Sequence, residues 1–154
     1  MEKLKVYWAA PLFNPRERQF NLDVVSELEP QIQVFLPQRD GALLIDMLDA
    51  GVPQIVAERR IFAQDVEAMR ASDLVVAVLD GAVVDDGVAF EVGFMHALGK
   101  ECMALQTDSR RALTSGNNPM LGQALMQIFT DPEALISWLT DKASKIGTAA
   151  RLQA

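Results

Sequence analysis

Short runs of apolar residues alternate with longer segments in which apolar residues recur at helical spacing. The apolar runs cover residues 5–13, 32–37, 73–81, 101–108 and 127–130. The segments between them carry apolar side chains at offsets of three and four residues, the spacing of one helix face. Strands that alternate with helices in this way predict an α/β fold, a doubly wound, five-stranded parallel sheet flanked by helices.

Capping residues and prolines mark the expected helix boundaries. Asn14 is expected to cap a helix whose first residue is Pro15. A capping-box pattern from Thr130 to Glu133 predicts the start of the last helix. Further helices are expected to cover residues 53–73, 87–99 and a stretch from about Pro119. Residues 38–51 are expected to form a loop that leads into a short helix ending at Gly51, and residues 109–118 have the composition of a loop. We predict a single domain over residues 1–145 and a frayed tail over residues 146–154.

Composition and charge narrow the choice of partner. The 154 residues are 50% apolar and 23% charged, which is typical of one folded domain, and the formal net charge is −7. An acidic chain is a poor match for a nucleic-acid backbone or an anionic membrane, so we expect small-molecule ligands. No stretch approaches the length of an apolar transmembrane helix, and a single cysteine rules out an intramolecular disulfide. A cytoplasmic enzyme or binding domain is the default expectation.

Two carboxylates lie on the apolar faces of neighbouring predicted helices. In "DDGVAFEVGFMHALGK", Glu91 shares its face with Val88, Phe94, Met95 and Leu98. Asp65 likewise has Ile61, Phe62 and Met69 as apolar neighbours at helical offsets. Acidic residues are seldom buried without a partner or a role. One reading is a shifted register or a side chain that reaches solvent; the other is a shared site at the carboxyl ends of the strands, where doubly wound folds bind ligands.

Asp85 and Asp86 precede this helix, and two readings apply to them. Asp at a helix start satisfies free N–H groups and suits the helix dipole. Alternatively, these carboxylates form a cluster with Asp65 and Glu91 in which neighbouring charges separate the pKa values into acid and nucleophile roles. Such a cluster suits cleavage of a glycosidic bond, and also a divalent metal ion.

Tyrosine, histidine and cysteine each occur once in the chain, and each is a further candidate for a functional site. Tyr7 lies near the end of the first strand, where it either packs in the core or orients a carboxylate. His96 faces away from Asp65 and Glu91 and is expected on the surface or at a subunit contact. Cys102 begins a buried strand and is expected to pack in the core. The chain lacks a G-x-G-x-x-G, a Walker loop and a G-x-S-x-G elbow, so dinucleotide, P-loop and α/β-hydrolase readings lose their main support.

The chain resembles the nucleoside 2-deoxyribosyltransferase family over roughly residues 4–130. The resemblance is strongest in "DDGVAFEVGFMHALGK" and is supported by "VYWAAPLF", "DVEAMRASDLVVAVLDG" and "NNPM". It implies that Glu91 is the nucleophile, that Asp85 and Asp65 handle protons and contact the base, and that Tyr7 holds the nucleophile. It further implies substrate-binding roles for Asn118, Met120, Asp86, Gly87, Asp40 and Phe13.

The same resemblance implies how the site is assembled. Asn118 and Met120 are expected to come from a neighbouring subunit, so the protein is expected to be a homo-oligomer built from dimers, up to a hexamer, with a shared active site. The expected ligands are 2'-deoxynucleosides and free nucleobases, with no cofactor and no metal ligand. The resemblance does not identify the residue after the second strand that reads the base, and Arg39 and Asp40 are the candidates. It also leaves two alternatives for substrate preference, purines alone or both purines and pyrimidines.

Two rival functions remain beside transfer of 2-deoxyribose between bases in nucleoside salvage. The first is an N-glycosidase of 2'-deoxynucleoside 5'-monophosphates with the same Glu nucleophile. That enzyme needs a phosphate pocket, and the first loop offers Arg16 and Arg18 but no Gly or Ser. The second is a non-catalytic nucleotide-sensing domain, whose signature would be replacement of Glu91, Asp85 or Tyr7; all three are present.

Overall fold

The computed structural model describes residues 3–111, 113 and 116–152, with side chains described as far as residue 146. Its centre is a five-stranded sheet in the order β2-β1-β3-β4-β5, and every neighbouring pair of strands is parallel. The strands are β1 (Lys5–Ala9), β2 (Gln33–Phe35), β3 (Leu74–Val78), β4 (Glu101–Leu105) and β5 (Gln127–Phe129). The prediction of a doubly wound, five-stranded parallel sheet is confirmed.

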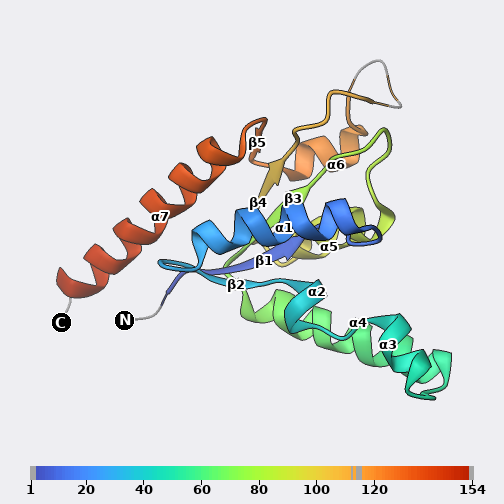
Figure 1. Cartoon of the computed structure of the whole chain (residues 1–154). Helices are drawn as coiled ribbons and strands as arrows, with labels where there is room; N and C mark the ends of the chain where they lie inside the picture. The colour runs from blue at the N-terminus through green and yellow to red at the C-terminus, as the bar shows by residue number, and fades with distance from the viewer. Residues whose placement is uncertain (1–2, 112, 114–115, 153–154) are drawn as a thin grey trace.

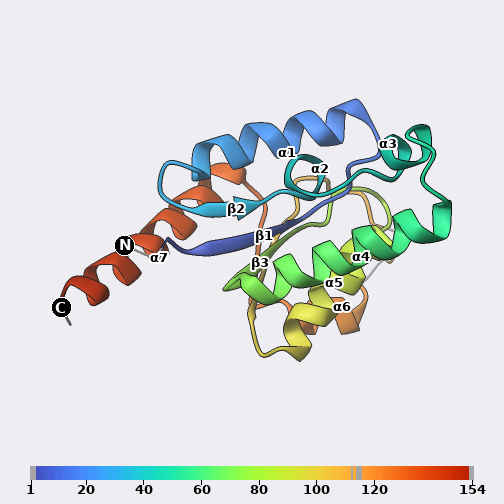
Figure 2. The ribbon, with the colours of Figure 1, turned by 90° about the horizontal axis from the view of Figure 1, so that it is seen from below.

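Helices cover both faces of the sheet (Figures 1 and 2). One face carries α1 (Pro15–Leu28) and α7 (Pro132–Leu152), and the other carries α4 (Gln54–Ala71), α5 (Asp86–Ala97) and α6 (Pro119–Ala124). Two short helices, α2 (Pro37–Asp40) and α3 (Leu44–Asp49), connect β2 to α4. Figure 1 shows α3 at the end of α4 that lies farthest from β1. No helix in the described part of the chain combines the length and apolar character needed to cross a membrane.

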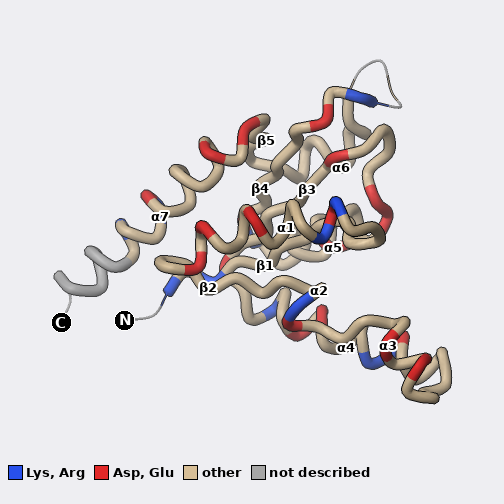
Figure 3. The backbone as a smooth tube through the Cα atoms, in the orientation of Figure 1, with Lys and Arg blue, Asp and Glu red and all other residues tan. Residues whose placement is uncertain are grey.

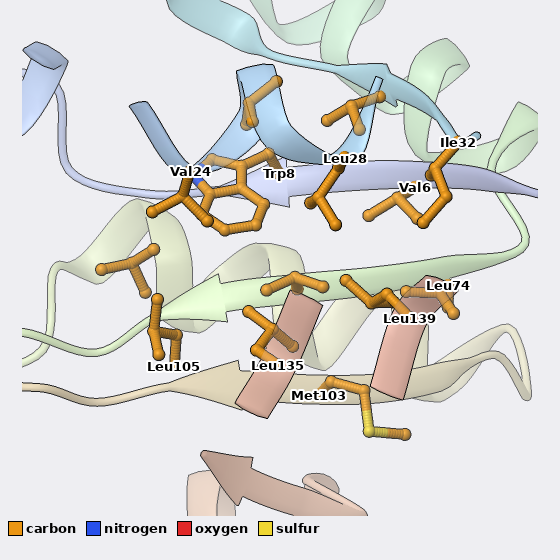
Figure 4. Close-up of a cluster of buried hydrophobic side chains, with 14 of the residues drawn as sticks. Val6, Trp8, Val24, Leu28, Ile32, Leu74, Met103, Leu105, Leu135 and Leu139 are labelled. Carbon is orange, nitrogen blue, oxygen red and sulfur yellow. The ribbon is translucent and has the colours of Figure 1, made fainter. Parts of the chain in front are cut away.

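Alternation along β1 divides the core into two layers. Val6 and Trp8 point toward α1 and α7, where they pack with Leu28 and Leu135 (Figure 4). Tyr7 and Ala9 point toward the opposite layer, which contains the buried residues of α5. Because successive side chains of a strand face opposite sides, the position of Tyr7 follows from that of Trp8. Tyr7 therefore lies in the layer that also holds the candidate carboxylates.

The local capping signal places the start of α1 correctly. Asn14 is the N-cap of α1: its Oδ1 accepts hydrogen bonds from the backbone N–H groups of Arg16 and Glu17, both at 3.0 Å. Glu17 completes a capping box by accepting from the Asn14 backbone N–H at 3.2 Å. The first helix was predicted with this cap, and the prediction is confirmed.

The last helix differs from its prediction at both ends. Its N-cap is Asp131, whose Oδ2 accepts from the backbone N–H of Ala134 at 3.1 Å, so the prediction of Thr130 was wrong. Pro132 explains the shift, since proline is favoured at the first helical position and the cap is the residue before it. The helix also continues to Leu152, and the predicted boundary between residues 145 and 146 falls inside it.

The segment after β2 also departs from its prediction. The residues directly after Pro37 were expected to begin a loop, but Pro37–Asp40 form α2. Pro37, which was expected to end the strand, is instead the first residue of this helix, where its missing N–H costs nothing. The turn positions Arg39 and Asp40 at the carboxyl end of β2.

A candidate active site at the carboxyl edge of the sheet

The strand order reverses at β1 and β3, and this reversal determines where a ligand can enter. From β1 the chain crosses to β2 on one side and returns to β3 on the other. In open α/β sheets such a switch point leaves a crevice at the carboxyl ends of the two strands. The loops that border it are residues 10–14 after β1 and residues 79–85 after β3. α5 starts directly after the second loop, so its inward face borders this crevice.

The Tyr7 hydroxyl donates a hydrogen bond to Oε1 of Glu91 at 2.6 Å. Tyr7 is completely buried, and its ring stacks on Phe35 of β2 with centroids 5.6 Å apart. Glu91 is half-buried, between Val88 and Met95 on the buried face of α5. Of the two sequence readings, the inward-facing carboxylate is therefore the one that the structure shows.

Burial raises the pKa of Glu91 to about 7. The hydrogen bond from Tyr7 opposes this rise because it stabilises the carboxylate, while the negative charges of Asp65 and Asp85 add to it. On α4, Asp65 is also half-buried, and burial raises the pKa of its carboxyl to about 6. The site thus has two carboxyl groups whose pKa values burial raises toward neutral pH, as is common for carboxyl groups in active sites.

Asp85 is a helix cap that also lies near Glu91. Its Oδ1 accepts from the backbone N–H of Val88 at 3.1 Å, which makes it the N-cap of α5. It is also close enough for its charge to raise the pKa of Glu91. Gly87 leaves room for this carboxylate, because a Cβ at that position would come within 3.0 Å of Asp85 Oδ1. Asp86 lies in the first turn of the helix and is exposed.

The alternative of a metal-binding cluster is not supported by the side-chain geometry. Among the described residues, no group of three or more His, Cys, Asp or Glu side chains is arranged to hold a metal ion.

Asp40 is occupied by contacts within its own loop. Its carboxylate accepts from the backbone N–H of Leu36 at 2.8 Å and pairs with Arg39 at 2.8 Å. Burial opposes ionisation, but these two hydrogen bonds outweigh it and keep the pKa of Asp40 below its usual range. Arg39 also pairs with Glu29 at 2.6 Å. Both candidates for reading the base thus brace the β2–α2 turn. Phe13, in the loop after β1, is 73% exposed.

Asn118 and Met120 lie on the other side of α5 from Glu91. Asn118 caps α6 by accepting from the backbone N–H of Met120 at 2.9 Å, and Met120 is 85% exposed. Both line a cavity of about 750 Å³ that also contacts α5 through Ala89, Val92, Gly93 and His96. Successive helix residues are about 100° apart around the axis, so these four positions are all about 100–160° from Glu91. The structure brings together Tyr7, Asp65, Asp85 and Glu91, and leaves Asn118 and Met120 on the opposite side of α5.

His96 and Cys102 occupy the environments expected from the sequence. His96 is exposed on α5 and lines the cavity beside α6. Cys102 is buried in β4, where burial raises the pKa of its thiol to about 11. A thiol that stays protonated at neutral pH is a poor nucleophile, so its role is packing.

Three residues near the site were not identified as candidates from the sequence. Phe35 stacks on Tyr7, which follows from β1 and β2 being paired with these two residues in register. Gln106 is only 8% exposed although it is polar, and its position directly after the apolar run of β4 was the available signal. Asp80, at the end of β3, accepts hydrogen bonds from the loop that follows β4.

The sequence profile of the family described as nucleoside 2-deoxyribosyltransferase matches residues 6–134. This match covers most of the 154 residues, and the chain belongs to this family. No curated protein matches the chain significantly.

Solved structures agree with this fold. A conserved protein from Enterococcus faecalis V583 superposes with a TM-score of 0.78 at 26% identity, over 92% of this chain and 99% of its own. A 2-deoxyribosyltransferase from Bacillus psychrosaccharolyticus gives 0.68 at 24% identity, over 86% and 90%. The CMP N-glycosidase BcmB of Clostridium botulinum gives 0.52 at 19% identity, over 88% and 97%. The fold is thus common to proteins named as transferases and as N-glycosidases.

Proposed function

We propose that the protein transfers 2-deoxyribose between nucleobases of 2'-deoxynucleosides through a covalent deoxyribosyl-Glu91 intermediate. The observation that carries the proposal is the 2.6 Å hydrogen bond between the buried Tyr7 hydroxyl and Glu91 Oε1. It holds one carboxylate oxygen in place and leaves Oε2 to attack the substrate. A nucleophile oriented by a neighbouring group is the usual arrangement in covalent catalysis.

The proposed reaction has two displacements at the same carbon. Glu91 attacks the anomeric carbon of the deoxyribose, the carbon–nitrogen bond to the base breaks, and Asp85 protonates the leaving base. A second base, deprotonated by the same group, then attacks the deoxyribosyl ester and releases Glu91. Two inversions retain the configuration, as in retaining glycosyl transfer. Asp65 adds a negative charge beside Glu91, and we propose that it contacts the base. Each step uses only carboxyl groups and substrates.

We further propose that each active site contains residues of two subunits. Asn118 and Met120 lie beside the face of α5 that points away from Glu91. They are therefore not positioned to contact a substrate bound at the Glu91 of their own chain. Their cavity is lined mainly by apolar residues and glycines of the loop after β3, of α5 and of α6, as expected of a surface that a second copy covers. The Oδ1 atom of Asn118 caps its own helix, which leaves the Nδ2 group to donate to a sugar hydroxyl of the neighbouring site.

The alternative is an N-glycosidase of 2'-deoxynucleoside 5'-monophosphates, and one feature favours it. A cavity of about 270 Å³ at the start of α1 is lined by Arg16 and Arg110, which could face a phosphate. However, Glu17, Asp80 and Asp108 line the same cavity, and Arg110 is paired with Asp108 at 2.5 Å. Three carboxylates would repel a phosphate dianion, so the transferase is the better supported function.

The proposed setting is nucleoside salvage in the cytoplasm, with deoxynucleosides and free bases as the ligands. The net charge of −7 supports small-molecule ligands over nucleic acid, and Figure 3 shows Lys and Arg dispersed over several elements of the described chain.

A chromatographic assay tests the proposal. The protein is incubated with 2'-deoxyinosine and adenine, with 2'-deoxyinosine alone, and with a deoxynucleoside monophosphate. We expect 2'-deoxyadenosine in the first mixture and slow release of base in the second. Release of base from the monophosphate alone would establish the N-glycosidase, and no product in any mixture would support a binding domain.

A further inference from the structure

Gln106 and Asn117 form a reciprocal amide pair next to Asn118. Gln106 Nε2 donates to Asn117 Oδ1 and Asn117 Nδ2 donates to Gln106 Oε1, both at 3.1 Å. Gln106 directly follows β4 and is 8% exposed, while Asn117 directly precedes the N-cap of α6. A buried amide needs hydrogen-bond partners, and each of these amides supplies them to the other.

The Gln106 end of the pair is anchored to the sheet. The Gln106 backbone N–H donates to the Phe129 carbonyl at 2.8 Å. The next two residues are held by Asp80, whose carboxylate accepts from the backbone N–H groups of Thr107 at 2.6 Å and Asp108 at 2.9 Å. Gln106 is therefore a rigid reference point at the carboxyl edge. Through the amide pair, it determines where the chain arrives at the start of α6.

We infer that Gln106 is a positioning residue for Asn118 and Met120, and that it acts on the active site of the neighbouring subunit. This inference rests on the proposed function, in which Asn118 contacts the sugar bound to the partner's Glu91. Asn118 follows Asn117 immediately, so a displacement of Asn117 moves the amide that would meet the substrate. A displacement of about 1 Å at a substrate-positioning group is enough to impair catalysis strongly.

Two variants break the pair from opposite sides. Gln106→Leu removes the buried amide at similar size, and Asn117→Ser shortens the half-buried partner beyond reach. The double variant Gln106→Asn with Asn117→Gln exchanges the two amides and preserves their combined length. We expect each single variant to lower kcat for base exchange about ten-fold or more, because the displaced Asn118 amide no longer meets the sugar correctly. The exchanged pair is expected to recover most of this loss.

Mixed oligomers separate positioning across subunits from a general loss of structure. Gln106→Leu chains are co-expressed with an excess of Glu91→Ala chains, and the mixed species are purified through two different affinity tags. Each intact Glu91 then faces an Asn118 from a chain with an intact amide pair. We expect the activity per intact Glu91 to return to near the wild-type value, as it should for Asn118→Ser chains treated in the same way.

Three outcomes would overturn the inference. Wild-type kinetics in both single variants would show that the pair does not position the site. Rescue of Asn118→Ser but not of Gln106→Leu or Asn117→Ser would show that the pair acts within its own subunit, with the shared site intact. Absence of base exchange in the wild-type protein would overturn the proposed function, and this inference with it.

Discussion

Tyr7 and Glu91 are separated by 84 residues in sequence, yet the Tyr7 hydroxyl donates to Oε1 of Glu91 at 2.6 Å. The phenol comes from a central strand and the carboxylate from the helix that follows the neighbouring strand. Because both elements are in the core, this contact is held by packing as well as by its own hydrogen bond. It links the stability of the sheet to the protonation of the proposed nucleophile.

Tyr7→Phe should shift the pH dependence of base exchange. Glu91 must be ionised to attack, so kcat/KM should rise with pH through the Glu91 pKa of about 7. The Tyr7 hydrogen bond lowers this pKa, and its loss should move the acid limb upward by about one pH unit or more. A pH profile of kcat/KM checks this. Phe35→Leu is the control, since it removes the stacking partner and keeps the hydroxyl; an unchanged limb in Tyr7→Phe would contradict the prediction.

Glu91→Gln should abolish base exchange and stabilise the fold at alkaline pH. The folded pKa of Glu91 is about 7, above its ordinary value of 4.5. Between these values the unfolded chain releases a proton that the folded chain retains, so this group reduces stability as pH rises and reaches a constant penalty above about 7. Gln carries no such penalty. We expect the variant to exceed the wild type by up to about 3 kcal/mol at pH 8, and the difference to vanish near pH 4.5.

Urea unfolding at the two pH values measures this difference. Equal stabilities at pH 8 would show that the carboxylate of Glu91 is not destabilised by burial. Normal exchange activity in Glu91→Gln would instead contradict its role as nucleophile.

Asn118→Ser and Glu91→Ala chains should complement each other. Serine can still cap α6 but lacks the amide, and alanine removes the nucleophile. Each variant alone should have little activity, whereas a mixed oligomer contains one site with both residues intact. We expect the mixture to regain base exchange, measured as 2'-deoxyadenosine formed after co-expression. Properly mixed oligomers without activity would indicate that each subunit uses its own Asn118.

Lys100→Met should destabilise the fold without affecting the proposed chemistry. Lys100 Nζ donates to the carbonyls of Met69 at 3.0 Å, Arg70 at 2.5 Å and Ser72 at the end of α4. A cation that satisfies the last carbonyls of a helix also suits its dipole. We expect a loss of about 1–3 kcal/mol in the free energy of unfolding. Lys145→Met, at an exposed position of α7, is the matched control, and an equal effect of both changes would contradict this role.

The periodicity of the sequence was sufficient for the sheet, for the first helix and for the inward face of α5. Glu91 was recognised from the offsets of Val88 and Met95, both of which are buried beside it. These features depend on spacing along one element, and the geometry of a single helix or strand determines them. The N-cap of α7 was missed for a local reason, because two capping signals overlapped and Pro132 favoured Asp131 over Thr130.

Contacts between distant elements were decided only by the tertiary structure. The strand order places β1 beside β3, and this brings Tyr7 to Glu91. The packing of α6 on α5 puts Asn118 on the face opposite Glu91, and the anchoring of β4 pairs Gln106 with Asn117. Local spacing specifies which face of an element is apolar, but which elements meet depends on how all the apolar faces are buried together. The sequence by itself therefore determined the inward carboxylates, and the assembled sheet decided which groups they meet.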